Sequence, residues 1–302
     1  MRRVPDRVLV VGGDGLIGRS VARCFRGQES TVVATTRRRE AVSADRPFLD
    51  LAEMPAEWSP PGRVDVAIVC AAITGRDQCE GEFSRTHGIN VEAPCTLLSR
   101  LMQAGTYCVF LSTNLVLGGA QPHLSSDAPY RPCDAYSRQK AEAERQLLDS
   151  PTSDGLLAIL RITKVLSASQ GAVKRWIERG AGGRPFEAFD DVAIAPVAVG
   201  HVCRSILAMA AVRSAGVHQL SGWPETSYAG MARALARACG WSEALVRPVE
   251  GRKVNRIARA TPPHASLDMG DLAALTGMQP PTPDAVAASI REDVRDSLGL
   301  AS

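Results

Sequence analysis

The chain has 302 residues, of which 45% are hydrophobic and 22% charged, and its formal net charge is +3. These values are ordinary for a folded protein with a sizeable core, arranged as one large domain or two. The small net charge gives no support to nucleic-acid or membrane-surface binding, and no apolar run approaches the roughly 20 residues of a membrane span.

The first residues, MRRVPDR, contain no apolar stretch, so we expect no secretory leader. The eight cysteines include no C-x-x-C pair, and the five histidines show no metal-ligand spacing. We interpret the cysteines as reduced, small hydrophobic side chains rather than as metal ligands. This interpretation predicts a cytoplasmic protein without a metal site.

Short β-branched runs alternate with helical patterns in the first half of the chain. Strands are predicted at residues 7–13, 30–36, 64–72 and 107–113, and helices at 17–25, 90–105 and 135–150. Strands that are apolar at consecutive positions and are separated by helices indicate a parallel sheet covered on both faces. Asp134 directly precedes the third helix and is its predicted N-cap.

The pattern becomes polar, glycine-rich and proline-rich after residue 165. Further strands are predicted at 156–165 and 217–222, and a helix that ends in glycine at 227–240. The whole predicts an α/β fold with a Rossmann-type doubly wound parallel sheet in residues 1–165, to which residues 195–222 return. Residues 166–302 are predicted to form mostly a smaller C-terminal α/β substrate-binding domain.

Three glycines, Gly12, Gly15 and Gly18, follow the first strand and open the first helix; they also read as Gly13-x-Gly15-x-x-Gly18. Glycines in this context allow a sharp turn, a close approach of pyrophosphate to the backbone and close packing of helix on strand. The phosphate then meets free N–H groups at the positive end of the helix dipole. A glycine turn without a ligand is the alternative, and we favour dinucleotide binding.

The second strand ends in arginines, at Arg37, Arg38 and Arg39, and not in a carboxylate. An acid at this place accepts hydrogen bonds from an adenosine ribose, whereas arginine binds a 2′-phosphate. The arginines therefore favour NADP(H), with NAD(H) as the second choice; a solvated basic loop is the alternative. Asp50, which follows the next short segment, is a candidate partner of the adenine amino group.

Tyr136 and Lys140 lie one helical turn apart and project from the same helix face. Lowering the pKa of a phenol from about 10 to about 7 requires roughly 4 kcal/mol. An ammonium group about 4 Å away supplies about that much. Ser112 and Thr113 end the preceding strand, where ligands bind in open α/β sheets. Together with the glycine loop, these residues predict that a hydroxyl holds a carbonyl while Tyr136 delivers a proton.

Several segments, in order along the chain, resemble the extended short-chain dehydrogenase/reductases, and within them the dTDP-4-dehydrorhamnose reductase branch of nucleotide-sugar enzymes. The glycine loop and YSRQK at 136–140 match the superfamily. CAAITGRDQCE at 70–80, Asn90, FLSTNLVLGG at 110–119 and FDDVAIAPVAV at 189–199 resemble this branch, as do LRITKV at 160–165 and PPHASLDMGDLAAL at 262–275.

The resemblance implies roles for particular residues. Thr113, Tyr136 and Lys140 are implied as the catalytic set of an NAD(P)-dependent oxidoreductase, with Lys140 also gripping the cofactor. The implied cofactor-binding residues are Gly12, Gly15, Leu16, Ile17, Gly18, Arg37, Arg38, Asp50, Leu51, Ala71, Ala72 and Lys140. The candidate substrate-binding residues are Thr74, Thr113, Asn114 and Trp176, and Arg184, Arg247 and Arg256 are candidates to meet a diphosphate.

The predicted function is NADPH-dependent reduction of a keto group on a nucleotide-linked 4-keto-6-deoxy sugar. The resemblance also suggests that two copies of the chain form a homodimer. Asn114 and Leu115 stand where relatives have Asp and Tyr, and Arg161 opens a segment that lacks their Trp, which leaves the sugar undefined. The alternatives are a nucleotide-sugar 4-epimerase or 4,6-dehydratase, and a non-catalytic NADP-binding regulatory subunit. An acid pair after Thr113, which a dehydratase needs for elimination, is missing.

Overall fold

The computed structural model describes residues 4–55 and 57–298, so the ends of the two predicted domains, at 1–3 and 299–302, lie outside the described residues. Close contacts divide the chain into two compact units. The first unit comprises Met1–Val116, Tyr130–Arg161 and Val202–His218, and the second comprises Leu117–Pro129, Ile162–His201 and Gln219–Ser302.

The main sheet has six strands in the order β10-β5-β4-β3-β1-β2. Its strands are β1 (Arg7–Val11), β2 (Thr31–Ala34), β3 (Val66–Val69), β4 (Tyr107–Thr113), β5 (Leu157–Ile162) and β10 (Gly216–Leu220). β1 pairs in parallel with β2 and β3, and β3 pairs in parallel with β4. The predicted Rossmann-type doubly wound sheet is confirmed.

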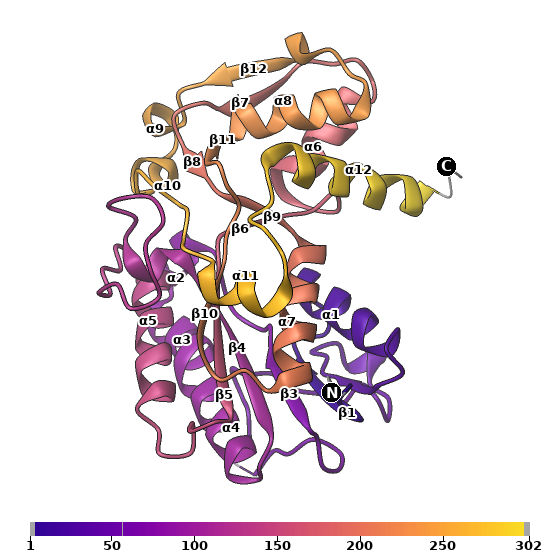
Figure 1. The fold of residues 1–302 in the computed structure, drawn as a ribbon, viewed down its shortest axis with the longest axis vertical. Coiled ribbons are helices and arrows are strands. Elements are labelled where there is room, and N and C mark those ends of the chain that lie inside the picture. The colour runs from indigo at the N-terminus through magenta and orange to yellow at the C-terminus, as the bar shows by residue number, and fades with distance from the viewer. Residues whose placement is uncertain (1–3, 56, 299–302) are drawn as a thin grey trace. The chain divides into compact units, whose positions relative to one another are not determined.

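Helices cover both faces of this sheet, with α1 (Leu16–Arg26) and α7 (Val199–Val212) on one side and α4 (Ala93–Gln103) and α5 (Ala135–Leu148) on the other (Figure 1). Leu9 and Val11 of β1 point toward α4 and α5, in one buried cluster with Leu98 and Leu147. Alternate residues of β1, such as Val10, are also fully buried, because the sheet is covered on both sides. Two short helices, α2 (Arg76–Gly81) and α3 (Phe83–His87), follow β3.

The second unit contains short strands in three two-stranded sheets, β11-β8, β12-β7 and β6-β9. The strands are β6 (Lys164–Leu166), β7 (Phe186–Phe189), β8 (Ala193–Ile194), β9 (Pro196–Ala198), β11 (Thr226–Ser227) and β12 (Val246–Val249). Its helices are α6 (Gly171–Gly180), α8 (Tyr228–Cys239), α9 (Gly251–Val254), α10 (Arg256–Arg259), α11 (Gly270–Thr276) and α12 (Pro283–Leu298). A separate core forms around α8 and includes Trp176, Phe186 and Ile290.

Two predicted elements differ in detail from the structure. The helix predicted at 90–105 begins with a π-helical turn at Gly88–Glu92 before α4. The strand predicted at 156–165 is divided into β5 and β6 at Thr163, whose N–H donates to Leu220 O and whose hydroxyl donates to Ala195 O. Thr163 thus bonds to other segments, which a local pattern does not reveal.

The predicted caps of two helices are confirmed. The Asp134 side chain accepts from the Ser137 N–H at 2.7 Å and the Ser137 hydroxyl accepts from the Asp134 N–H at 3.1 Å, which makes a capping box at the start of α5. Gly240 ends α8 in the left-handed conformation, with φ of 72°. The capping box fixes where α5 begins, and therefore where Tyr136 and Lys140 lie.

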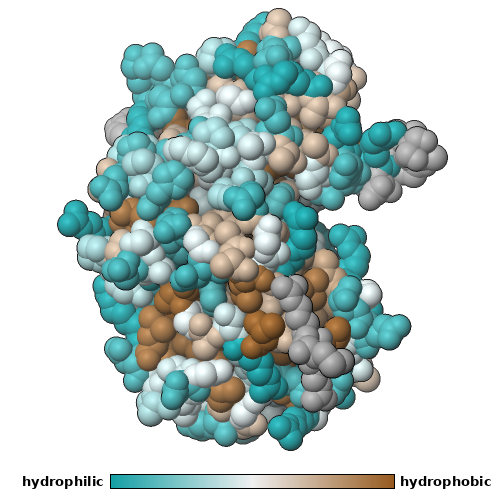
Figure 2. Space-filling model, viewed as in Figure 1, coloured by the Kyte–Doolittle hydropathy of each residue, from teal (hydrophilic) through white to brown (hydrophobic). Residues whose placement is uncertain are grey.

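The surface is mostly hydrophilic on the face drawn in Figure 2, with hydrophobic residues gathered on part of it. The large hydrophobic side chains that are exposed come from both units: Val4, Val42, Phe83, Leu148, Val212, Trp223 and Val254. Within residues 4–55 and 57–298, the structure contains no helix with the length and apolar character that crossing a membrane requires.

Gly18 lets α1 press against the end of β1, because a Cβ on Gly18 would overlap Gly12 O and Gly12 C. Gly81 is also helical, but a Cβ there would meet nothing within 4 Å. We expect Gly18→Ala to lower the free energy of unfolding by about 1–3 kcal/mol through overpacking. Gly81→Ala is the matched control and should raise it by about 0.5–1 kcal/mol. Urea unfolding of both variants measures the two effects, and a neutral Gly18→Ala would contradict this packing.

Candidate active site

The glycine loop lies between the ends of three neighbouring strands. Gly12 has φ of +87°, and its N–H donates to Thr35 Oγ1 at 3.0 Å, beyond the end of β2. The Gly13 N–H donates to Thr35 O at 3.0 Å. A Cβ on Gly12 would meet Ala71 N at 2.8 Å, just beyond β3. Only glycine fits at Gly12, because the backbone is left-handed and the strand ends crowd it.

The start of α1 fits the pyrophosphate of a dinucleotide. Its N-cap is Gly15, which makes no side-chain cap, and the first turn carries no acidic residue. The N–H groups of such a first turn have no partner within the helix, and the helix dipole favours an anion there. Gly12, Gly15, Leu16, Ile17 and Gly18, all predicted to bind cofactor, make up this loop and first turn.

The other predicted cofactor residues are less uniform. Ala71 and Ala72 are half-buried at the end of β3, beside the loop, whereas Leu51 is buried in the core between sheet and helices. Asp50 accepts from the Ala52 N–H at 3.0 Å and lies in an exposed turn. Arg37 and Arg38 are exposed. The structure therefore brings the alanines to the loop and directs Leu51 into the core.

Lys140 is buried in the middle of α5, with 2% of its surface exposed. Its Nζ lies 3.7 Å from the centre of the Phe110 ring on β4, a cation–π contact. Burial lowers the pKa of Lys140 to about 7, although the Glu144 carboxylate, one turn further on, and Cys95 oppose this shift. In the chain without ligand, the Lys140 side chain therefore changes between ammonium and neutral amine near neutral pH.

Tyr136 lies one turn before Lys140 on α5, and Thr113 ends β4, the strand whose Phe110 contacts Lys140. Tyr136 is half-buried, and burial together with Cys79 and Asp134 raises the pKa of its phenol. The expectation of a neutral pKa is therefore not met in the free chain, since Lys140 faces Phe110 and is itself buried. Thr113 is 7% exposed, and its Oγ1 lies 3.4 Å from Asn114 Oδ1 and accepts from the Leu115 N–H.

A buried carboxylate, Glu144, holds these elements together. It is fully buried and accepts from Ser112 Oγ, from the Tyr130 hydroxyl at 2.8 Å and from Arg161 NH2 at 2.7 Å. Ser112 precedes Thr113 on β4, Arg161 lies on β5, and Glu144 shares its helix face with Lys140. One carboxylate therefore ties β4, β5 and α5 together beside the candidate catalytic residues.

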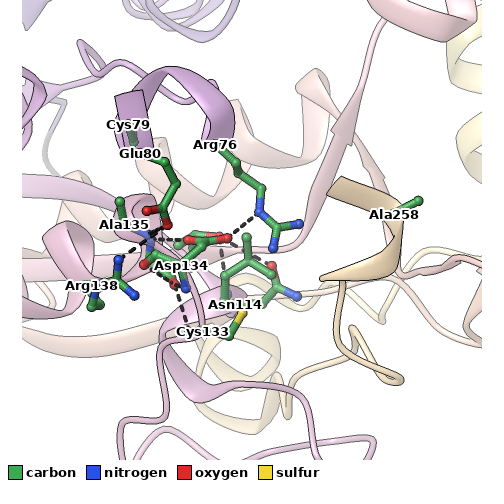
Figure 3. Close-up of polar contacts among 12 residues, drawn as sticks. Arg76, Cys79, Glu80, Asn114, Cys133, Asp134, Ala135, Arg138 and Ala258 are labelled. Carbon is green, nitrogen blue, oxygen red and sulfur yellow. Dashed lines mark hydrogen bonds and ion pairs between the residues drawn. The ribbon is translucent and has the colours of Figure 1, made fainter. Parts of the chain in front are cut away.

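A second ion pair fixes the first turn of α5 (Figure 3). Arg76, the first residue of α2, donates from Nε to Asp134, and both side chains are mostly buried. Glu80 of α2 accepts from the Ala135 N–H at 2.7 Å and from Arg138 at 3.3 Å. These contacts hold α2 against the first turn of α5, which carries Tyr136.

Asn90, in the π-helical turn, joins the loop after β3 to α5. Its side chain exchanges hydrogen bonds with the Ile73 N–H and carbonyl and donates to Gln139 Oε1 at 2.8 Å. Thr74 follows this anchored point and is exposed, and Asn114 is half-buried beside Thr113. The first unit thus contains the predicted catalytic and cofactor-binding residues, whereas Trp176, Arg184, Arg247 and Arg256 belong to the second unit.

The second unit contains Trp176, in a cavity of about 980 Å³. Trp176 is 3% exposed, donates to Glu187 O and lies near the rings of Phe186 and Tyr228, so it is a core residue that lines the cavity. The basic residues that line the cavity are Lys164, Arg175, Arg179 and Arg247. Arg247 was a predicted diphosphate partner, whereas Arg184 and Arg256 do not line this cavity.

Several site residues were missed by the sequence interpretation. Phe110 reads as an ordinary strand residue, and Glu144 is signalled only by its spacing of four from Lys140. Asp14 lies within the glycine motif, and Arg179 lies one turn from Arg175. No cluster of metal-ligating side chains is found in the part of the chain that the structure describes.

The fold and the glycine loop define a Rossmann-type nucleotide-binding protein of the extended short-chain dehydrogenase/reductase kind. The chain belongs to the family described as RmlD substrate binding domain, whose model matches residues 6–294. This match confirms the resemblance seen in the sequence.

Two relatives and one solved structure illustrate what the chain is similar to. A dTDP-4-dehydrorhamnose reductase of Mycobacterium tuberculosis is 26% identical, over 84% of this chain and 82% of the relative. Methionine adenosyltransferase 2 subunit beta of Danio rerio is 30% identical, over 47% of this chain and 43% of the relative. A dTDP-4-dehydrorhamnose reductase structure from Bacillus anthracis, in complex with NADP, has a TM-score of 0.82 at 19% identity, over 95% of this chain and 99% of that one.

The buried ammonium of Lys140 gives a pH-dependent stability. Its pKa is about 7 in the folded chain against 10.5 ordinarily, so the unfolded chain binds more protons between these values and stability rises with pH there. Lys140→Met removes a buried charge and should raise the free energy of unfolding at pH 6 by about 1–3 kcal/mol, with a smaller gain at pH 9.

Urea unfolding at pH 6 and pH 9 measures this gain. Lys174→Met is the control, because Lys174 lies on α6 with 57% of its side chain exposed, and it should show no such trend. A gain for Lys140→Met that grows toward pH 9 would contradict the assignment.

Proposed function

We propose that the chain is an NADPH-dependent reductase of a keto group on a nucleotide-linked 4-keto-6-deoxy sugar. The observation that carries this proposal is the hydroxyl, phenol and ammonium set of Thr113, Tyr136 and Lys140 in the unit that holds the glycine loop. The names of relatives support the substrate class, since the Mycobacterium tuberculosis protein is a dTDP-4-dehydrorhamnose reductase. NAD(H) is the second choice of cofactor.

The first unit binds the dinucleotide in this proposal. The loop at Gly12–Gly18 holds the pyrophosphate, and the arginines after β2 meet the 2′-phosphate. NADPH supplies the hydride when bound. Lys140 of α5 grips the nicotinamide ribose, as the resemblance implies.

The proton comes from Tyr136. Reduction adds a hydride to the carbonyl carbon and a proton to its oxygen, and the raised pKa of Tyr136 keeps the phenol protonated at neutral pH, as a proton donor must be. Thr113 donates a hydrogen bond to the same oxygen as negative charge develops on it. The Lys140 ammonium stabilises the phenolate that is left, which regains its proton from solvent.

The second unit binds the nucleotide part of the substrate. Its cavity of about 980 Å³ suits a ligand of nucleotide size, and aromatic rings line it beside four basic side chains. Phe186 and Tyr228 offer faces for a base, and Arg175, Arg179 and Arg247 offer charge-assisted hydrogen bonds to a diphosphate. Binding of the nucleotide part of the substrate is thus assigned to the second unit, whereas Thr113 of the first unit meets the keto oxygen.

The alternatives have less support. Asn114 and Leu115 follow Thr113 and cannot exchange the proton of an elimination, which disfavours a dehydratase. A regulatory role is suggested by the Danio rerio relative, but that likeness spans less than half of either chain. We also propose that the protein is cytoplasmic, since the eight cysteines form no disulfide in the described part of the chain. The homodimer stays a prediction from the resemblance.

Tyr136→Phe should lower kcat for NADPH-dependent reduction of dTDP-4-keto-6-deoxyglucose by about 100-fold or more, because the proton donor is lost. NADPH binding should be retained. The control is Tyr107→Phe, which removes a phenol that donates to Ser214 O in the core and should leave kcat unchanged. Wild-type protein that binds NADPH but reduces no keto sugar nucleotide would refute the proposed reaction.

Arg247→Ala should weaken binding of dTDP by about tenfold, the worth of one charge-assisted hydrogen bond. Isothermal titration calorimetry of the full chain measures this change. Arg184→Ala is the matched control, because Arg184 is an exposed arginine of the same unit that lies outside the cavity lining and bonds Glu178 O. Equal losses in both variants would count against the cavity as the nucleotide site.

A further inference from the structure

One carboxylate in the glycine loop gathers the basic residues that follow β2. Asp14 Oδ1 accepts from Arg38 NH2 at 3.0 Å and from Arg46 NH2 at 2.7 Å. Its other oxygen accepts from Thr36 Oγ1 at 2.7 Å and from the Arg37 N–H at 3.3 Å. The arginines predicted to bind a 2′-phosphate are therefore already next to an anion, which belongs to the loop itself.

The Asp14 carboxylate lies where β2 ends, although Asp14 belongs to the loop after β1. An acid at the end of the second strand is the group that bonds the adenosine ribose in NAD-binding Rossmann folds. The end of β2 itself carries Thr35, Thr36 and Arg37 and no carboxylate. Hydrogen bonds from Thr36 and from the Arg37 N–H hold the Asp14 carboxylate at the end of β2, although Asp14 belongs to the glycine loop. The end of β2 therefore has both an acid and arginines beside it.

Asp14 is charged and reachable from solvent. Burial raises the pKa of this carboxyl, but hydrogen bonds from Thr36, Arg38 and the Arg37 N–H outweigh burial and lower it below its usual value. Its side chain is 26% exposed and that of Arg38 is 57% exposed. A ligand can therefore reach both the carboxylate and Arg38 from solvent, and it would compete with the bonds that Asp14 already makes.

We propose that Asp14 sets the choice between the two nicotinamide cofactors, as a specificity-determining residue that rests on the proposed dinucleotide site. Its carboxylate accepts hydrogen bonds from the ribose hydroxyls of NAD(H). Toward NADP(H) it acts in the opposite direction, because it repels the 2′-phosphate and competes with it for Arg38 and Arg46. The chain thus binds both cofactors. Its affinity for NADP(H) exceeds its affinity for NAD(H) by a smaller factor than the arginines alone would give.

The test is the pair of dissociation constants for NADPH and NADH, measured by nucleotide fluorescence on the full chain without substrate. Asp14→Asn keeps an oxygen that accepts from Thr36 but removes the charge. We expect NADPH to bind about tenfold more tightly, the size of effect of one nearby unit charge at a protein surface, and NADH to bind several-fold more weakly. Competition by 2′,5′-ADP against 5′-AMP should shift in the same direction.

Glu53→Gln is the matched control, since it removes the same charge from an exposed loop of the same unit and touches none of the Asp14 contacts. Asp14→Ser is the second variant if the asparagine variant does not fold. An unchanged ratio of the two constants, or an equal change in Glu53→Gln, overturns the role of Asp14 while leaving the reductase proposal intact. Wild-type chain that binds neither cofactor overturns both.

Discussion

The interior of the first unit contains the buried charged residues Lys140, Glu144 and Arg161. Glu144 offsets the cost of burying them, because its carboxylate pairs with Arg161 and lies one helical turn from Lys140. A buried ion costs several kcal/mol unless its hydrogen bonds are satisfied. Here the carboxylate receives bonds from Ser112, Tyr130 and Arg161, and the Lys140 ammonium lies on the same helix face. The network is also the mechanical link between β4, which ends in Thr113, and α5, which carries Tyr136. A fully satisfied polar core of this kind fixes one arrangement of the elements that it joins.

The directions in which the pKa values of Tyr136 and Lys140 shift fit the proposed role of Tyr136 as a proton donor. Burial acts on both groups and favours their neutral forms, so the pKa of the phenol rises and that of the ammonium falls. A phenol that stays protonated at neutral pH suits reduction, in which the oxygen of the product must receive a proton. In the proposed mechanism, Lys140, whose pKa of about 7 allows it to be charged at neutral pH, acts on the phenolate after proton transfer and not on the resting phenol.

The sequence predicted the features that local patterns encode, and missed those that depend on contacts between distant segments. The strands, the Asp134 cap, the terminating Gly240 and the glycine loop all follow from neighbouring residues, and the structure contains them. The contact of Lys140 with Phe110 crosses from α5 to β4, and Asp14 meets Arg46 from 32 positions away. The side chain of Leu51 packs in the core, which its sequence position did not reveal, and its predicted contact with the cofactor stays a prediction.

The small net charge of +3 hides a strongly uneven local distribution. In the second unit, four basic side chains line one cavity, with Glu187 as the acidic residue among its described lining. In the first unit, the arginines after β2 are partly neutralised by Asp14, whereas the start of α1 carries no acid at all. A cavity lined by four basic residues and one acidic residue suits a diphosphate whatever sugar it carries, whereas an arginine cluster that is paired with a carboxylate discriminates between a phosphate and a diol. In the proposed function, affinity for the substrate and choice of cofactor are therefore set by different balances of charge, each visible only when side chains are placed in space.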